Sequence, residues 1–270
     1  MSNPHADELD VLLSDESLAQ VLTSCKIDRK SVRFGFAGGS IVQGWGNKDS
    51  DVDLYVIVDQ LEPGYELEEV HDTRLAAGPI PVACLDLPGR RADVEVWTIQ
   101  QVEQVLGLVG QQNDQRSSSA LEGLSYFELD FLEKLGHGRA VFGHEEVSER
   151  QGQLRDSAWH GMLTEQALLL SDIYLEDAVG QLESSDVISS VLSAKLAFGH
   201  SVDAVAVSSG LIGRSPKWRA RRVQLANSDV LPFEEYWQIE TMQNYAPERP
   251  GDWVRQVVNV CRRISAKVAV

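Results

Sequence analysis

The chain has 270 residues, of which 43% are hydrophobic and 24% charged, and its formal net charge is −17. This length accommodates one or two domains with a sizeable buried core. Such an acidic balance opposes binding to a phosphate backbone, which needs clustered Lys and Arg, and favours cationic partners. We therefore expect no nucleic-acid partner, although a local basic patch is compatible with this overall charge.

The cysteines and the hydropathy pattern bear on the compartment. Cys25, Cys84 and Cys261 lie far apart and form no Cys-x-x-Cys pair. A small, odd number of widely spaced cysteines favours a reducing compartment over a disulfide framework or a zinc site. The first ten residues are polar and acidic, unlike a signal peptide, and no apolar run approaches the length of a membrane span. We expect a cytoplasmic protein with no membrane partner.

The first predicted elements are one or two helices over residues 9–22, followed by a strand over residues 32–36 in which apolar side chains alternate. The strand ends at Gly38-Gly39-Ser40. Two glycines let the backbone approach a ligand closely, and a serine hydroxyl with free N–H groups can hold a phosphate oxygen. Residues 41–45 are long enough for about one helical turn.

A second strand, residues 52–58, brings two acids to one face. Its valines and Leu54 form one apolar face, and Asp51, Asp53 and Tyr55 face the other way. Two carboxylates so placed repel each other unless a cation lies between them. Hard oxygen ligands of this kind hold Mg²⁺ while phosphates fill its remaining positions. The alternative is a strand start whose acids merely face water.

The middle of the chain predicts the rest of a sheet. Residues 61–77 are acidic and mixed, and form a helix or a loop. Residues 80–87 and 92–99 are strands around the turn signal Pro88-Gly89. The pattern predicts a mixed sheet of four or five strands with helices.

These motifs together resemble the nucleotidyltransferase superfamily, whose fold is that of the DNA polymerase beta catalytic domain. The resemblance implies a third acid on a later strand. Asp93 and Glu95 share a face of residues 92–99 and are both candidates, and Glu95 is preferred because Val94 and Val96 enclose it. That strand is also similar to one in aminoglycoside adenylyltransferases. The residues that carry the resemblance are Gly39, Ser40, Gly44, Ser50, Asp51, Val52, Asp53 and Leu54.

The resemblance is firm over roughly the first hundred residues, and beyond them the chain resembles the helical second domain of small-molecule nucleotidyltransferases in outline. Residues 101–109 show helical spacing and residues 111–118 a polar loop. Ser119 and Glu122 form a capping box for a helix that Gly136 ends. Residues 139–143 are an extended link, where we place the boundary between a catalytic domain, 1–140, and a helical domain, 141–270. Later helices, forming a bundle, are expected at 162–175, 187–207, 231–242 and 253–268.

The fold class is therefore α/β (α+β), a mixed nucleotidyltransferase sheet followed by a helical bundle. The resemblance implies that Asp51 and Asp53 bind one Mg²⁺, and that a second Mg²⁺ bridges them, Glu95 and the acceptor oxygen. Glu95 acts instead as the general base in the alternative mechanism, and the sequence leaves both roles open. Gly39 and Ser40 would clamp the terminal phosphates of the nucleoside triphosphate.

Residues 210–222 are the most basic stretch of the chain. Enzymes of this family place a basic residue from the helical domain on the triphosphate, and Lys217 is our candidate for it. A solvated lysine in a basic loop is the alternative, and Arg214 and Arg221 carry the same ambiguity. Lys195, on an apolar helix, is a weaker candidate, and we expect a structural role for His200.

The resemblance implies transfer of a nucleoside monophosphate, AMP from ATP in the leading case, to a hydroxyl group of a small molecule. An aminoglycoside-like antibiotic, inactivated by the transfer and so a basis for antibiotic resistance, is the leading acceptor. Acids and aromatics at residues 234–240 suit such a cationic acceptor. The alternatives are toxin-like transfer to a protein or tRNA, and a non-catalytic nucleotide-binding regulator. The base, the acceptor and the oligomeric state stay open.

Overall fold

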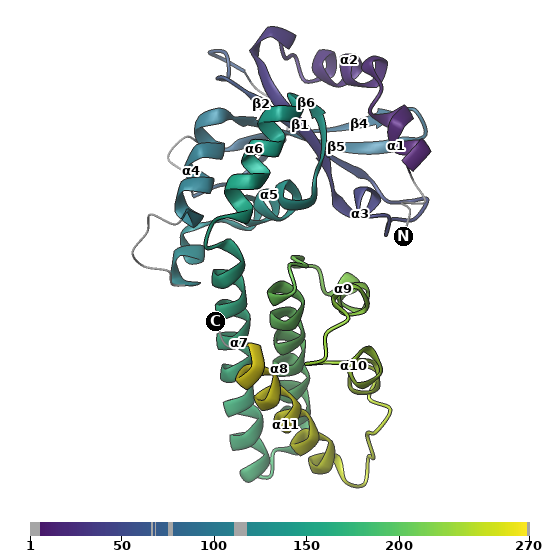
Figure 1. Ribbon diagram of the computed structural model, residues 1–270, viewed down its shortest axis with the longest axis vertical. Helices are drawn as coiled ribbons and strands as arrows, with labels where there is room; N and C mark the ends of the chain where they lie inside the picture. The colour runs from purple at the N-terminus through teal and green to yellow at the C-terminus, as the bar shows by residue number, and fades with distance from the viewer. Residues whose placement is uncertain (1–5, 66, 68, 75–77, 111–117, 269–270) are drawn as a thin grey trace. The chain divides into compact units, whose positions relative to one another are not determined.

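The computed structural model describes residues 6–65, 67, 69–74, 78–110 and 118–268. The chain divides into two compact units, one of Met1–Gln115 with Ser119–Ser157 and one of Arg116–Ser118 with Ala158–Val270. The first contains a mixed sheet with helices and the second contains helices (Figure 1), so the expected fold class is confirmed.

The division falls later than the expected boundary at residue 140. Residues Arg139–Phe142 form a strand, β6, that pairs antiparallel with β1, and α6, His144–Arg155, packs against that part of the sheet and against α5. Pairing and packing therefore hold this segment to the sheet of the first unit.

The sheet of the first unit has six strands in the order β3-β4-β5-β2-β1-β6. Strands β2 and β5 at its centre run parallel, and the other neighbours are antiparallel. Four strands match the predicted ones closely. The remaining two, both at edges, were missed, because β3 is only three residues long and β6 has no clear apolar alternation. The strands are β1 Val32–Gly38, β2 Val52–Val58, β3 Glu69–His71, β4 Ile80–Leu87, β5 Arg90–Thr98 and β6 Arg139–Phe142.

The two faces of the sheet bury different side chains. On one face, Leu54 and Val56 of β2 join the leucines and valines of α1 and α2 in an aliphatic core. On the other face the core is aromatic: Phe36, Tyr55 and Trp97 surround Phe131 of α5, with ring centroids 4.2–5.6 Å from that of Phe131. The central strand β2 is thus buried on both faces, which explains its almost continuous apolar sequence.

Capping residues set where two helices of this unit begin. Thr98 and Gln101 form a capping box at the start of α4, and Ser125 and Glu128 form one at the start of α5. The predicted box at Ser119 is wrong, because residues 118–123 form a 3-10 turn and the true cap lies six residues later. Most of the predicted loop 111–118 lies outside the described residues. The helices are α1 Ala6–Leu12, α2 Asp15–Ser24, α3 Gly39–Val42, α4 Ile99–Val109, α5 Tyr126–His137 and α6 His144–Arg155.

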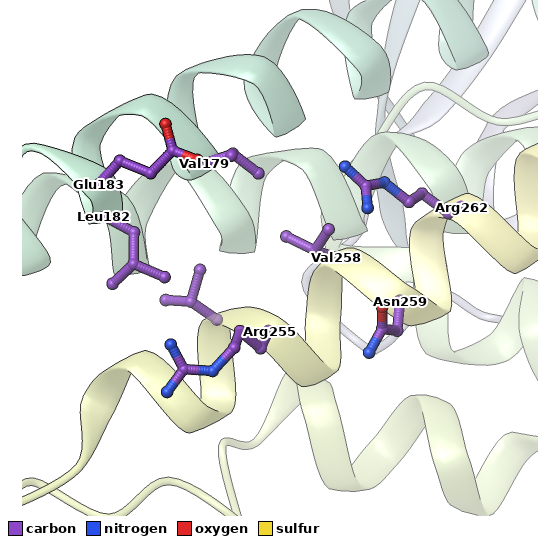
Figure 2. A pocket seen from close by; sticks show the side chains of 8 residues that line it. Val179, Leu182, Glu183, Arg255, Val258, Asn259 and Arg262 are labelled. Carbon is purple, nitrogen blue, oxygen red and sulfur yellow. The ribbon is translucent and has the colours of Figure 1, made fainter.

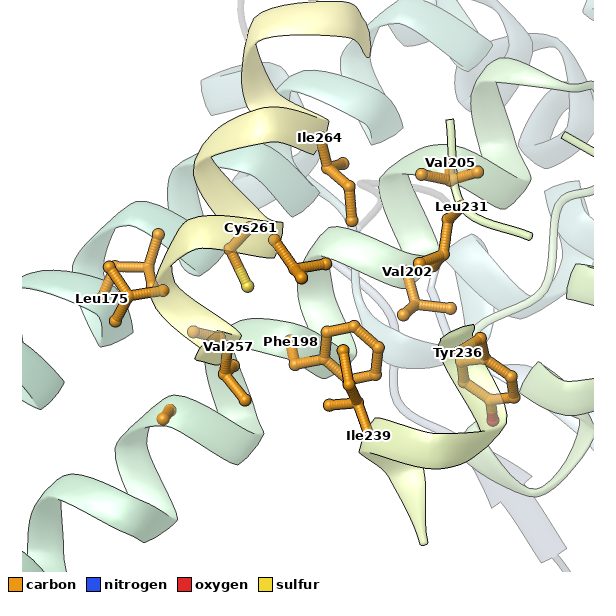
Figure 3. Close-up of a cluster of buried hydrophobic side chains, with 14 of the residues drawn as sticks. Leu175, Phe198, Val202, Val205, Leu231, Tyr236, Ile239, Val257, Cys261 and Ile264 are labelled. Atoms are coloured by element: carbon orange, nitrogen blue, oxygen red, sulfur yellow. The ribbon is translucent and has the colours of Figure 1, made fainter. Parts of the chain in front are cut away.

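The second unit is built on a long helical hairpin. Its helices are α7 Trp159–Glu183, α8 Val187–Ser208, α9 Arg219–Ala226, α10 Phe233–Glu240 and α11 Pro250–Val268. Figure 3 shows Phe198 and Val202 of α8 packed with Ile239 of α10 and Val257 of α11 in one apolar cluster. Helix α11 is amphipathic and buries its valine face there. Across the described residues, no helix is both long and apolar enough to cross a membrane.

Candidate active site

The acids predicted from the sequence lie at the centre of the sheet of the first unit. Asp53 of β2 is level with Asp93 of β5, and Glu95 is level with Tyr55. Because side chains alternate along a strand, Asp51, Asp53 and Tyr55 share one face, as do Asp93 and Glu95. This is the face that α5 covers, since Asp53 contacts Lys134 of that helix.

A lysine that the sequence analysis missed lies directly on Asp53. The Lys134 ammonium is 2.9 Å from Asp53 Oδ1 and 2.8 Å from Asp130 Oδ2, which lies one turn earlier on α5. Burial raises the pKa of Asp53; Lys134 opposes this shift, and the charges of Asp130 and Glu95 add to it. Burial disfavours the charged form of Lys134, but the carboxylates of Asp53 and Asp130 outweigh it and raise its pKa above the usual range.

Both glycines of the predicted phosphate turn make room for this ion pair. A Cβ on Gly38 would lie 2.9 Å from Cβ of Lys134, and a Cβ on Gly39 would collide with the carboxylate of Asp53. Gly39 also has φ +83°, which L side chains rarely adopt. The four residues from Gly39 form α3, so Ser40 starts a single helical turn beside Asp53.

Asp51 is paired with a different cation. Its Oδ2 is 2.8 Å from Nη2 of Arg91, whose Nε is 3.7 Å from Oδ1 of Asp93. The neighbouring Arg90 is buried, and it donates hydrogen bonds to the backbone carbonyls of Asn47 and Ser50 and pairs with Glu8. Arg90 therefore clamps the loop that leads into Asp51, and Arg91 forms a solvent-exposed ion pair with Asp51.

Glu95 is almost fully buried, and neighbouring side chains orient it. The indole N–H of Trp97, two residues along β5, donates to Glu95 Oε2 at 2.9 Å. The other oxygen, Oε1, lies 3.6 Å from Nδ1 of His71, whose ring stacks on Phe127. Trp97 and His71 are thus further site residues that the sequence analysis did not identify. Of these two residues, only Trp97 could have been identified from the sequence, because it lies two residues after Glu95 and therefore faces the same side of the strand.

The arrangement does not fit two Mg²⁺ ions held by Asp51, Asp53 and Glu95. Asp51 is engaged by Arg91, and Asp53 by Lys134. Within the described part of the chain, no group of three or more His, Cys, Asp or Glu side chains is arranged to hold a metal. The charges of Asp130 and Glu95 act on Asp53 together with that of Lys134, so the carboxylates around Asp53 outnumber its ammonium partner.

The second unit contains the predicted basic residues. Lys217 is exposed in the turn Pro216–Trp218, with its ammonium 5.5 Å from the ring centroid of Trp218. Arg219 and Arg222 of the same stretch both pair with Asp203 of α8, at 2.7 and 3.1 Å. Lys195 donates a hydrogen bond to a backbone carbonyl of α10. Asp203 therefore holds two arginines of this basic stretch in structural pairs, whereas Lys217 is exposed.

A cavity of about 560 Å³ lies between α7 and α11 of the second unit. Figure 2 shows Leu182 and Val258 at its apolar wall, with Glu183, Arg255 and Arg262 around them. Two guanidinium groups against one carboxylate suit an anionic or amphiphilic molecule better than the cationic acceptor expected from the sequence.

No family model matches the sequence, and no curated protein matches it. The structure is similar to the crystal structure of a nucleotidyltransferase-like protein from Exiguobacterium sibiricum 255-15, with a TM-score of 0.51 and 10% identity. The match covers 93% of this chain and 74% of that one. At this level of identity the similarity concerns the fold. The chain therefore has a nucleotidyltransferase-like fold, with the predicted acids Asp53 and Glu95 on one face of its central strands.

Proposed function

We propose that this protein transfers a nucleoside monophosphate, AMP from ATP in the leading case, to a hydroxyl group of a small molecule. The observation that carries the proposal is the position of Asp53 and Glu95, on adjacent parallel strands of a nucleotidyltransferase-like fold, beside the Gly38-Gly39 turn. The proposal includes a cytoplasmic location, where ATP is available. The net charge of −17 favours a cationic acceptor, such as an aminoglycoside.

In the proposed reaction, the acceptor oxygen attacks the α-phosphorus of the triphosphate. The bond from this phosphorus to the oxygen bridging to the β-phosphate breaks, and pyrophosphate leaves with its electron pair. The hydroxyl proton passes to Glu95, whose Oε1 is left available because Trp97 binds Oε2. Bound Mg²⁺ would supply positive charge to the phosphates. Ser40, and Lys217 from the second unit, are proposed to contact the phosphates.

A second candidate function is nucleotide binding without catalysis. One observation favours it: the pairing of Asp51 with Arg91 and of Asp53 with Lys134, which neutralises the two acids expected to hold metal. A nucleotide-binding regulator needs affinity for the triphosphate but no group that accepts a proton.

The test incubates the full-length protein with Mg²⁺, each of the four nucleoside triphosphates labelled at the α-phosphate, and a panel of aminoglycosides and other polyhydroxylated amines. We expect pyrophosphate release and a labelled acceptor, both abolished in D53N and strongly reduced in E95Q. Nucleotide binding measured by calorimetry without pyrophosphate release from any acceptor would favour the regulator. Transfer that persists in D53N would overturn the role given to this acid.

A further inference from the structure

The cavity between α7 and α11 has an apolar wall that is continuous with the core of the second unit. Val179 and Leu182 of α7 line it together with Val254 and Val258 of α11. The two valines of α11 are buried in the core cluster, and the two residues of α7 pack against that cluster. The volume of about 560 Å³ lies within the range of about 300–1,000 Å³ that is usual for small-molecule sites. A small molecule in this cavity would therefore contact aliphatic side chains of both helices.

A glycine lets the two helices approach at one end of the cavity. A Cβ on Gly251, in the first turn of α11, would lie 3.2 Å from Cδ1 of Leu182 and 3.5 Å from Nη1 of Arg255. The absence of a side chain at residue 251 thus brings the start of α11 against the end of α7, with the guanidinium group of Arg255 beside them. This contact bounds the cavity at that end.

Polar side chains of α11 form the rim of the cavity. Arg255, Asn259 and Arg262 follow one another at intervals of four and three residues, so they share one face of the helix. All three are exposed, and Figure 2 shows the guanidinium group of Arg262 extended from α11 beside Val258. Hydrogen-bond donors therefore lie directly next to the apolar wall.

The charges at this rim favour an anion with a single charge. The charged residues that line the cavity, with those that pair with them, are Arg249, Arg255, Arg262, Glu183 and Asp252. Three positive and two negative charges leave a net charge of +1, in a chain whose net charge is −17. Asp252 pairs with Arg249 and Arg255, whereas within the described part of the chain no ion pair holds Arg262. Arg262 is therefore the guanidinium group that a ligand can reach.

We propose that this cavity binds a small aliphatic molecule with one carboxylate group. The aliphatic chain would lie on the wall formed by Val179, Leu182 and Val258, and the carboxylate would accept charge-assisted hydrogen bonds from Arg262. One carboxylate balances the net charge of the rim, whereas a phosphate monoester carries about two negative charges at pH 7. Such a ligand differs from both the triphosphate and the cationic acceptor of the proposed function, so the inference does not depend on that function.

The test is isothermal titration calorimetry of the full-length protein with octanoate. We expect one octanoate per chain in the wild type, at least fivefold weaker binding in R262M, and unchanged binding in R263M. Arg263 is the matched control, because it is the next residue on α11 but pairs with Glu235 and does not line the cavity. Butanoate should bind more weakly than octanoate, because it covers less of the apolar wall.

Octan-1-ol, which has the same chain without the charge, separates the carboxylate from the chain. It should bind the wild type more weakly than octanoate does, and R262M should bind it as the wild type does. Failure of octanoate to bind the wild type would overturn the inference, as would equal binding of octanoate to R262M and the wild type. No nucleotide enters these titrations, so their outcome is independent of the test for nucleotidyl transfer.

Discussion

The indole N–H of Trp97 donates a hydrogen bond to the carboxylate of Glu95, 2.9 Å away and two residues earlier on the same strand. This contact leaves one carboxylate oxygen for chemistry and directs it toward His71. The orientation of the proposed base therefore depends on a neighbouring side chain in the same strand.

Replacing Trp97 by Phe is expected to lower the rate of the proposed transfer more than it changes the fold. The ring remains, but Glu95 loses the hydrogen bond that holds Oε2, so its other oxygen is no longer held in one orientation. We expect the free energy of unfolding to fall by about 1–2 kcal/mol. The measurement is the rate of transfer, with denaturant unfolding alongside.

The matched control for this change is W253F. Trp253 is equally buried, and its indole nitrogen has no hydrogen-bond partner among the described residues. W253F should lose packing only and leave the rate of transfer unchanged. Identical rates for W97F and the wild type would contradict a role of Trp97 in orienting Glu95.

Replacing Gly39 by Ala is expected to disturb Asp53. Gly39 and Gly64 both have positive φ, +83° and +79°, but only a Cβ on Gly39 meets another group, the carboxylate of Asp53, whereas one on Gly64 meets nothing within 4 Å. G64A therefore measures the backbone strain alone, about 1 kcal/mol, and G39A should lose about 3 kcal/mol. Chemical denaturation measures both. Equal losses would show that Asp53 moves aside without cost.

Arg90 is expected to be important for stability, and Arg91 is not. Arg90 is buried against Glu8 and two backbone carbonyls of the loop before Asp51, so R90M leaves these acceptors without their donor and should cost about 3 kcal/mol. Arg91 is exposed, and its pairs with Asp51 and Asp93 are solvated, so R91M should unfold at nearly the wild-type midpoint. A larger loss in R91M than in R90M would reverse this assignment. Thermal unfolding of the two variants, side by side, provides the comparison.

His137 is expected to make stability depend on pH. Burial lowers its pKa from 6.5 to about 4, and its ring nitrogen accepts a hydrogen bond from Gln43 in the neutral form. The unfolded chain therefore binds this proton more readily than the folded one, and stability falls as pH drops from 6.5 to 4. This contribution is at most about 3 kcal/mol and should be smaller in H137Q. Unfolding of both proteins across this range measures it, and a His137 titration by NMR with a midpoint above 6 would contradict it.

Local patterns in the sequence determined much of the fold and part of the site. The two acids alternate with the apolar face of β2, and strand alternation alone puts Asp51 and Asp53 on the same side. Helical periodicity likewise predicted α8 and α11 of the second unit. These features depend on residues a few positions apart, so they can be predicted from the sequence alone.

Only the tertiary structure determines which side chains contact those acids. Tyr55 and Asp130 are 75 residues apart, yet their side chains touch, and Lys134 reaches Asp53 from the same helix. A lysine on an amphipathic helix has no local signal that separates an ion pair with a distant strand from an exposed position. The third acid was chosen from its strand, and its partner Trp97 lies two residues along that same strand. Its other partner, His71 on β3, meets it only because the sheet forms. The same is true of β6, because a short edge strand is stabilised by pairing with β1 and not by its own sequence.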